Sequence, residues 1–265
     1  MMLLVDVGNT QTVIGVTDNS SKLGEYRAKW RISTDKRATS DDILSIIAPL
    51  FEISEIPMDG IDSGVISSVV PSLERSWTSF MSAQCGVRMA VCNAALAHEA
   101  GLFDCDYPSP HEIGADRIAD AIAAKAIFGS PVVVVDFGTA TNMEVIDRDG
   151  LFIGGAIAPG VSTASEALFS NASKIQPAPF CAPERPIGRS TREAVESGIV
   201  LGQAVMVDGL LEKFFGQLGY RAPAIGTGGL VNVVGGLCAN ITEICPDLTI
   251  DGLRLLGEKI KGGGV

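Results

Sequence analysis

Two short Asp-x-Gly segments carry residue types that bind phosphates and cations. The first is Asp6-Val7-Gly8, which Asn9 and Thr10 follow, and the second is Asp136-Phe137-Gly138, which Thr139 follows. A carboxylate can hold a divalent cation or its water shell, and glycine lets a backbone approach a phosphate closely. Hydroxyl and amide groups can donate hydrogen bonds to phosphate oxygens. Each segment therefore predicts a phosphate-binding turn.

The two turns lie in segments that repeat one plan. Residues 3–18 read LLVDVGNTQTVIGVTD, and residues 132–147 read VVVVDFGTATNMEVID. Each segment begins with an apolar strand and continues, after its turn, into a second strand of alternating apolar residues. A single Asp-x-Gly turn would be an ordinary loop. Two copies in matching surroundings predict two homologous domains.

This pair of turns resembles the actin-like and sugar-kinase superfamily, in which ATP lies in a cleft between two halves. The resemblance implies an α/β fold of two RNase-H-like domains with a nucleotide cleft between them, and we expect the domains at residues 1–110 and 111–265. A P-loop is absent, because Glu258 stands where the stretch 252–259 would need lysine. The glycine-rich stretch 224–236 fits a tight turn and an adenine–ribose contact equally well.

A third carboxylate, Asp116, lies in the block YPSPHEIGADRIADAIAAKAIFG at residues 107–129. Apolar residues recur there at helical spacing, which puts Asp116 and Arg117 in the first turn of a helix. An acidic residue at that place commonly complements the helix dipole, and spacing alone favours this role by roughly two to one. The position just before the second turn favours the alternative, in which Asp116 accepts a proton from a substrate hydroxyl while Arg117 holds an acid group of the substrate.

Other segments supply the elements around these turns. The sequence TSDD at residues 39–42 leads into a helix, which Ser40 or Asp41 is expected to cap. Residues 64–73 predict a strand. The stretch Ala194–Leu211 predicts a helix with more apolar residues than one buried face needs, which favours a subunit interface. A helix buried inside the second domain explains the same pattern nearly as well.

Composition argues against several classes of protein. A formal net charge of -11 and a pI near 4.6 leave no Lys/Arg surplus for a phosphate backbone, so we expect no nucleic-acid partner. The six cysteines form no CxxC pair and there are only two histidines, which argues against a zinc site or a disulfide framework. We see neither a signal peptide nor an apolar run long enough to span a bilayer. We therefore expect a cytoplasmic protein with no membrane partner.

Seven motifs together resemble the type III pantothenate kinases. In order along the chain they are DVGNT at 6–10, YxxPxE[IV]GADR at 107–117, DFGTAT at 136–141, GGAIAPG at 154–160, IGxxT at 187–191, TGG at 227–229 and PxLTxDGL at 246–253. Each motif is short, but the GADR block together with two Asp-x-Gly turns is hard to assign elsewhere. Two positions depart from the family pattern: Asn142 stands where threonine is common, and Glu144 where aspartate is usual.

The resemblance implies an ATP-dependent phosphorylation of pantothenate in coenzyme A synthesis. Asp116 would be the general base on the pantothenate hydroxyl, and Asp6 would face a magnesium ion. Asp136 would hold the potassium or ammonium ion that this family uses. The residues that would contact the ATP phosphates are Asp6, Val7, Gly8, Asn9, Thr10, Gln11, Thr12 and Val13 from the first domain and Gly138 and Thr139 from the second.

The resemblance also implies a substrate pocket and an assembly. Family members are homodimers, and the pantothenate pocket lies close to the subunit interface. The residues that would line this pocket are Tyr107, Gly114, Ala115, Asp116, Arg117 and Thr191.

Two other functions would share the turns. A kinase of the same superfamily that acts on a sugar or a carboxylate would differ at Tyr107, at residues 114–117 and at Thr191. An actin-like or chaperone ATPase would use the turns to drive assembly or partner release. Such proteins usually need extra subdomains, for which 265 residues leave little room.

Overall fold

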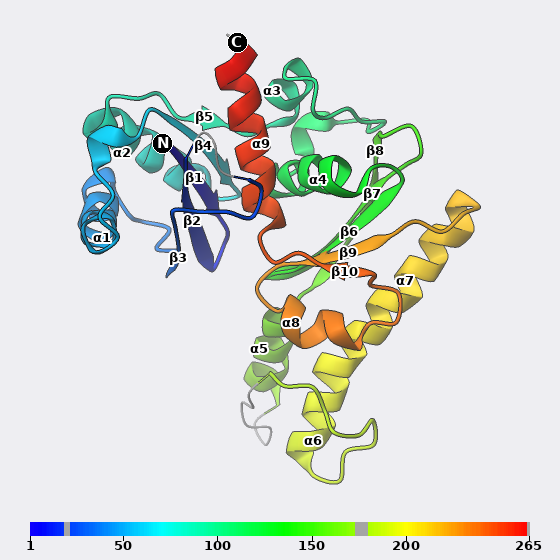
Figure 1. The fold of residues 1–265 in the computed structure, drawn as a ribbon. Coiled ribbons are helices and arrows are strands. Elements are labelled where there is room, and N and C mark those ends of the chain that lie inside the picture. Colours follow the sequence, from blue (N-terminus) through cyan, green and yellow to red (C-terminus); the bar gives the residue numbers. More distant parts are fainter. Residues whose placement is uncertain (19–21, 173–179, 264–265) are drawn as a thin grey trace. The chain divides into compact units, whose positions relative to one another are not determined.

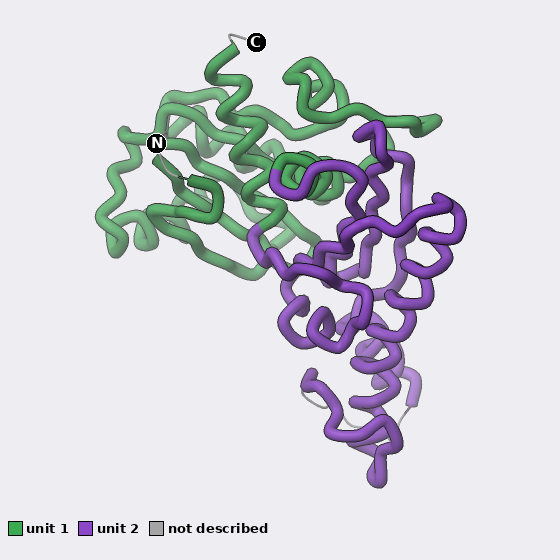
Figure 2. The backbone as a smooth tube through the Cα atoms, turned by 45° about the vertical axis from the view of Figure 1, so that its right-hand side comes forward, with its two compact units in different colours: residues 1–126, 248–265 green, residues 127–247 purple. Residues whose placement is uncertain are grey.

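The chain folds into two compact units in a computed structural model that describes residues 1–18, 22–172 and 180–263. Unit 1 comprises Met1–Ala126 and Leu248–Val265, and unit 2 comprises Ile127–Asp247 (Figure 2). The first boundary between the units falls after residue 126, whereas we expected it after residue 110. Residues 111–126 and the C-terminal helix are grouped with the first sheet.

Unit 1 is built on a five-stranded sheet with the order β3-β2-β1-β4-β5 (Figure 1). The β1–β2 and β2–β3 pairs are antiparallel, whereas β4 is parallel to β1 and to β5. The central strand β1 is almost wholly apolar, as a strand covered on both faces should be. The strands are β1 (Met2–Val7), β2 (Gln11–Thr17), β3 (Ala28–Ser33), β4 (Ser63–Ser68) and β5 (Ala90–Val91).

Helices α1 and α2 contribute Phe51 and Trp77 to a core that includes Val5 and Ile14 of the sheet. Helix α9 packs on β1 and β4. Glycine at position 252 lets α9 approach α4, because a Cβ there would lie 1.9 Å from the backbone oxygen of Ala119. The helical elements of unit 1 are α1 (Ser40–Ile53), η1 (Met58–Gly60), α2 (Pro71–Cys85), α3 (Ala94–Glu99), η2 (Pro110–Glu112), α4 (Ala115–Phe128) and α9 (Leu248–Gly263).

The N-terminus of α1 corrects one prediction. The capping residue is Thr39, not Ser40 or Asp41. The Thr39 hydroxyl accepts from the backbone N–H of Asp42, and the Asp42 carboxylate accepts from the backbone N–H of Thr39. This reciprocal pair is a capping box, which needs an acceptor three residues after the cap, and aspartate supplies it here.

Unit 2 repeats the sheet of unit 1 with the order β10-β9-β6-β7-β8. Again the central strand has an antiparallel neighbour on one side and a parallel neighbour on the other. The predicted repeat of the two segments at 3–18 and 132–147 is therefore confirmed. The strands are β6 (Val132–Phe137), β7 (Ala140–Ile146), β8 (Phe152–Pro159), β9 (Ala224–Thr227) and β10 (Glu243–Ile244).

The most apolar helical segment of unit 2 runs from Thr191 to Leu218 through α6, η3 and α7. Its inner side, which includes Val207 and Leu211, packs into the core beneath the sheet. By length and composition alone this segment could cross a membrane, contrary to the expectation from the sequence, although core helices of soluble proteins meet the same test. The helical elements are α5 (Val161–Asn171), α6 (Thr191–Glu196), η3 (Ser197–Leu201), α7 (Gly202–Leu218), α8 (Val231–Val234) and η4 (Gly235–Leu237).

Candidate active site

The first turn follows β1, and the carboxylate of Asp6 lies where that strand ends. Asp6 lies opposite Val13 in β2. The N–H of Gly8 donates to the oxygen of Gln11 at 3.0 Å, which closes the turn. A Cβ at Gly8 would lie 2.9 Å from that oxygen, so the turn requires glycine. Asn9 and Gln11 are exposed, as groups that meet a ligand from solvent should be.

Asp116 lies in the first turn of α4, as the sequence predicted. Its Oδ1 accepts from the backbone N–H of Arg117 at 2.9 Å. The carboxylate lies over Gly114, where a Cβ would come within 2.4 Å of Oδ1. Burial raises the pKa of Asp116, although the Arg117 amide and guanidinium oppose the shift. A carboxyl group with a raised pKa is suited to take up a proton.

Asp6 and Asp116 are coupled electrostatically within unit 1. Burial raises the pKa of Asp6 to about 7, and the charge of Asp116 adds to this shift. Ser67 and Arg31 lower the pKa of Asp6, but they do not cancel the rise. Two carboxylates that disfavour each other's ionisation form a site that a cation would stabilise.

Three neighbours of this pair were not predicted as site residues. Ser67 lies opposite Asp6 in the parallel strand β4, and its buried hydroxyl lowers the pKa of Asp6. Cys92 donates from Sγ to the backbone oxygen of Ala115 at 3.5 Å. Burial raises the pKa of Cys92 to about 12, and both carboxylates add to the shift, so the thiol stays neutral. Arg31 reaches the site from β3, the edge strand.

The second turn, after β6, is shaped by three glycines. The N–H of Gly138 donates to the oxygen of Ala140 at 3.0 Å. A Cβ at Gly160 would lie 2.3 Å from the oxygen of Gly138. Gly228 has a φ of +93°, and a Cβ there would lie 2.1 Å from Oδ1 of Asp136. The turn and the Asp136 carboxylate therefore pack directly against the backbone of these glycines. A larger residue at Gly160 or Gly228 would push the turn or the carboxylate out of place.

Three polar residues lie near Asp136 on the sheet. Thr227 is its partner in β9 and Asn142 is its partner in β7. Glu144 is fully buried two residues beyond Asn142, so both departures from the family pattern lie next to the second turn. The backbone oxygen of Thr139 accepts from Thr163 Oγ1 at 2.7 Å, which ties this turn to α5.

The remaining predicted residues fall in two places. Tyr107 is partly buried in the loop before η2, while Ala115 and Arg117 flank Asp116 in α4. Thr191 is the exposed first residue of α6, which Figure 1 shows at the end of unit 2 away from its sheet. The glycine-rich stretch 224–236 forms β9, a turn at Gly228, α8 and η4, and its positive φ agrees with the tight-turn interpretation.

The carboxylates fit some metals better than others. Among the described residues, no three His, Cys, Asp or Glu side chains group as ligands for one metal ion. Magnesium is usually held by one or two carboxylates together with substrate phosphates. The Asp6 carboxylate, the neighbouring Asp116 carboxylate and the buried Ser67 hydroxyl together form a donor set of that kind.

Comparison with known proteins identifies relatives along almost the whole chain. A family model described as type III pantothenate kinase matches residues 2–213. The type III pantothenate kinase of Thermomicrobium roseum is 40% identical over 260 residues, which cover 98% of each chain. That of Desulfosudis oleivorans is 36% identical over 259 residues, covering 97% of this chain and 99% of the relative.

Solved structures share the fold at low identity. A Campylobacter jejuni protein described as a Baf family transcriptional activator has a TM-score of 0.59 and 16% identity, over 99% of this chain and 98% of that one. A ROK family glucokinase from Streptomyces griseus has a TM-score of 0.52 and 11% identity, over 97% of this chain and 99% of that one. The predicted fold class, that of the actin-like ATPases and sugar kinases, is confirmed.

Proposed function

The chain belongs to the type III pantothenate kinase family, and on that premise we propose that it uses ATP to phosphorylate pantothenate to 4′-phosphopantothenate. The observation that supports this most strongly is the coupling of Asp6, beside a phosphate-binding type of turn, with Asp116 in the GADR block. A phosphate turn alone would suit any nucleotide-binding protein. A second carboxylate with a raised pKa beside it supplies a base for an alcohol acceptor.

The first turn is proposed to bind the phosphates through its backbone amides and its polar side chains. Gly8 allows the close approach, and Asn9 and Thr10 are exposed for contact. Val7, Gln11, Thr12 and Val13 complete this set on either side of the turn. In unit 2, Gly138 and Thr139 are proposed to contact the phosphates as well.

In the proposed reaction the primary hydroxyl oxygen of pantothenate bonds to the γ-phosphorus, the bond from that phosphorus to the β–γ bridging oxygen breaks, and ADP leaves. Asp116 would accept the hydroxyl proton on its carboxylate. A raised pKa brings this carboxyl closer to neutrality, where a general base works best. Gly114, Ala115 and Arg117 would hold the substrate around it, together with Tyr107.

Cations complete the proposal. Magnesium and a monovalent ion, when bound, would neutralise charge on the phosphates. Asp6 would hold the magnesium, and Asp136, potassium or ammonium. Thr191 would reach pantothenate near the interface of a homodimer, consistent with its exposed place at the start of α6. A cytoplasmic location without nucleic-acid or membrane partners stays a prediction from composition.

A coupled assay of ADP release over a panel of acceptors tests the proposal. Pantothenate should give the highest kcat/KM, ahead of hexoses, acetate and water. Equal turnover with a hexose or acetate would contradict pantothenate as the substrate and would instead support another kinase of the same fold. ATP hydrolysis that is independent of any acceptor would favour an ATPase instead.

A further inference from the structure

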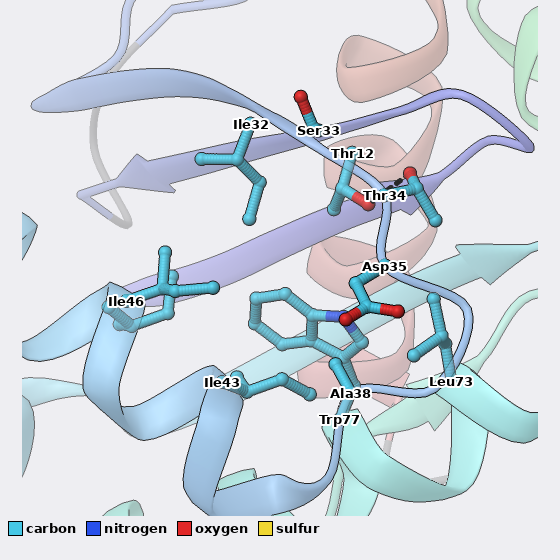
Figure 3. Close-up of a pocket in the computed structure, with 11 residues that line it drawn as sticks. Thr12, Ile32, Ser33, Thr34, Asp35, Ala38, Ile43, Ile46, Leu73 and Trp77 are labelled. Atoms are coloured by element: carbon cyan, nitrogen blue, oxygen red, sulfur yellow. Dashed lines mark hydrogen bonds between the residues drawn. The ribbon is translucent and has the colours of Figure 1, made fainter.

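Thr34, directly after β3, is hydrogen-bonded to three residues of the first turn. Its backbone N–H donates to the oxygen of Thr10 at 2.9 Å, and its Oγ1 donates to the oxygen of Gly8 at 2.9 Å. Its Oγ1 also lies 2.9 Å from Oγ1 of Thr12 (Figure 3). A threonine hydroxyl has a single hydrogen, so Thr12 is the donor in the last pair. Thr34 is therefore hydrogen-bonded to Gly8, Thr10 and Thr12, which are alternate residues of the turn.

Two flanking contacts reach the turn from the same segment. Lys36 Nζ donates to Oδ1 of Asn9 at 3.0 Å, and Arg31 Nη1 donates to Oε1 of Gln11 at 2.9 Å. All four of these side chains are exposed, where such bonds compete with water. Thr34 is partly buried and its bonds include two backbone carbonyls, so its contacts should be the more persistent ones.

The space behind Thr34 is a small cavity rather than a packed wall. It measures about 30 Å³ and is lined on its inner side by Ile43, Leu73 and Trp77 (Figure 3). Side chains therefore do not pack fully against Thr34 on this face, and its hydrogen bonds to the turn contribute to holding it in place.

We propose that Thr34 is a positioning residue that sets the conformation of the Asp6–Thr12 turn for nucleotide phosphates. The inference rests on the proposed function for the nature of that ligand. Phosphates bind N–H groups and are repelled by carbonyl oxygens. Because Thr34 binds the carbonyls of Gly8 and Thr10, it holds both oxygens toward β3, so that neither carbonyl is free to face a phosphate.

Three variants separate this role from a general effect on folding. Thr34→Val keeps the shape and the backbone bond but loses both side-chain bonds, and Thr34→Ser keeps the hydroxyl. Thr17→Val is the matched control, because Thr17 is a buried threonine at the other end of β2 whose hydroxyl donates to the backbone oxygen of Asp18. Calorimetry with a non-hydrolysable ATP analogue and magnesium, without pantothenate, measures nucleotide affinity. Amide hydrogen exchange measures the opening of the turn.

Thr34→Val should raise the Kd of the analogue by about tenfold, as expected for the loss of two hydrogen bonds of modest net strength. The KM for ATP should rise with it, while the KM for pantothenate changes less than about twofold. Amides of residues 8–12 should exchange faster. Thr34→Ser should stay within about threefold of the wild-type Kd. Thr17→Val should lose stability without any change in Kd.

An unchanged Kd in a folded Thr34→Val protein would overturn the inference, as would an equal rise in Thr17→Val. If Thr34→Val does not fold, Thr12→Val removes the Thr12–Thr34 bond and should speed amide exchange of residues 8–12 in the nucleotide-free protein, a readout that a direct phosphate contact of Thr12 would not move; unchanged exchange would overturn the inference. A wild-type protein that binds the analogue but does not phosphorylate pantothenate would remove only the proposed function. A wild-type protein that binds no nucleotide would overturn both.

Discussion

Ser67 and Thr227 hold equivalent positions in the two units. Ser67 is the partner of Asp6 in the parallel strand next to β1, and Thr227 is the partner of Asp136 in the parallel strand next to β6. Both hydroxyls are buried; that of Ser67 lowers the pKa of Asp6, and that of Thr227 has no hydrogen-bond partner among the described residues. A buried hydroxyl without a partner normally costs stability. Because a hydroxyl lies beside each turn aspartate, we expect both hydroxyls to contact a ligand.

Removing either hydroxyl should therefore affect binding more than folding. Thr227→Val should change the free energy of unfolding by less than about 1 kcal/mol, or stabilise the ligand-free protein, because no existing hydrogen bond is lost. Ser67→Ala should cost no more than about 1 kcal/mol, the net worth of one hydrogen bond. Nucleotide binding with magnesium should weaken in Ser67→Ala, and the response to potassium should weaken in Thr227→Val. Urea unfolding and calorimetry measure the two effects. A large loss of stability with unchanged binding would contradict the prediction.

The raised pKa of Asp6 predicts how stability depends on pH. The pKa of this carboxyl is about 7 in the folded protein, against an ordinary value of 3.8. Between these values the folded state binds a proton that the unfolded state has released, so the contribution of Asp6 to stability falls as pH rises and levels off above the folded pKa. Asp6→Asn removes this dependence. It should stabilise the ligand-free protein by about 1–3 kcal/mol more at pH 8 than at pH 5.

Urea unfolding at both pH values in EDTA checks this prediction. Asp41→Asn is the matched control, since Asp41 is an exposed carboxylate on α1, and it should show little difference between the two pH values. Asp116→Asn should reduce the effect of the Asp6 substitution, because the charge of Asp116 contributes to the raised pKa of Asp6. Equal effects of Asp6→Asn at both pH values would show that this carboxyl is ionised throughout.

Asp136 is expected to mediate a response to monovalent cations. Its carboxylate lies against the backbone of Gly228. Asp136 belongs to unit 2, whereas Asp6 belongs to unit 1, so we expect the two carboxylates to hold different cations. Turnover should rise steeply with potassium or ammonium but not with sodium, and Asp136→Asn should weaken that rise. Initial rates in chloride salts at constant ionic strength measure the response. Full activity of the wild type in sodium alone would give Asp136 another role.

Exposed apolar residues in unit 2 predict the dimer. Val205 on α7 and Ile157 on β8 are 63% and 65% exposed, although each belongs to an element that otherwise packs into the core. Val205→Glu should convert a dimer to a monomer in solution scattering and raise the KM for pantothenate. Ile53→Glu is the control, because Ile53 is 81% exposed at the end of α1 in unit 1. A wild-type monomer with full activity would refute the interface.

Local patterns predicted much of the site. The two turns, the repeated strands and the place of Asp116 in the first helical turn follow from periodicity over neighbouring residues, and the structure confirms each of these elements. Contacts between distant segments were missed. Ser67 meets Asp6 only through parallel strand pairing, and Thr34 meets the turn only through the edge strand. No local pattern specifies which strands become neighbours.

The division into compact units differs from the expected domain boundary for a similar reason. An amphipathic helix shows which of its faces is buried but not which sheet it covers. The C-terminal helix α9 returns to β1 and β4 of the first sheet, where glycine at position 257 leaves room for Met2 and Val65. The cap of α1 was misplaced by one or two residues because Thr39, Ser40 and Asp41 are all good capping residues. Only the capping box with Asp42 distinguishes Thr39.

Asp116 is expected to act as a general base and not merely as an acid that stabilises the start of α4. The structural role predicts little for Asp116→Asn, because asparagine has nearly the same volume and can still accept from the Arg117 amide, and a lost cap costs about 1 kcal/mol. The base role predicts a loss of about 10²- to 10⁴-fold in kcat, since an amide cannot take up the proton.

The control is binding of pantothenate and an ATP analogue to Asp116→Asn by calorimetry, together with its thermal unfolding. A folded variant that binds both ligands but fails in turnover isolates the chemical step, and its residual rate should no longer show the fall toward low pH that protonation of Asp116 causes in the wild type. Because the pKa of Asp116 is raised, that fall should appear closer to neutrality than for an ordinary aspartate in the free enzyme. Turnover within about threefold of wild type, far short of the loss expected without a base, would instead assign proton removal to Asp6 or to the phosphate itself.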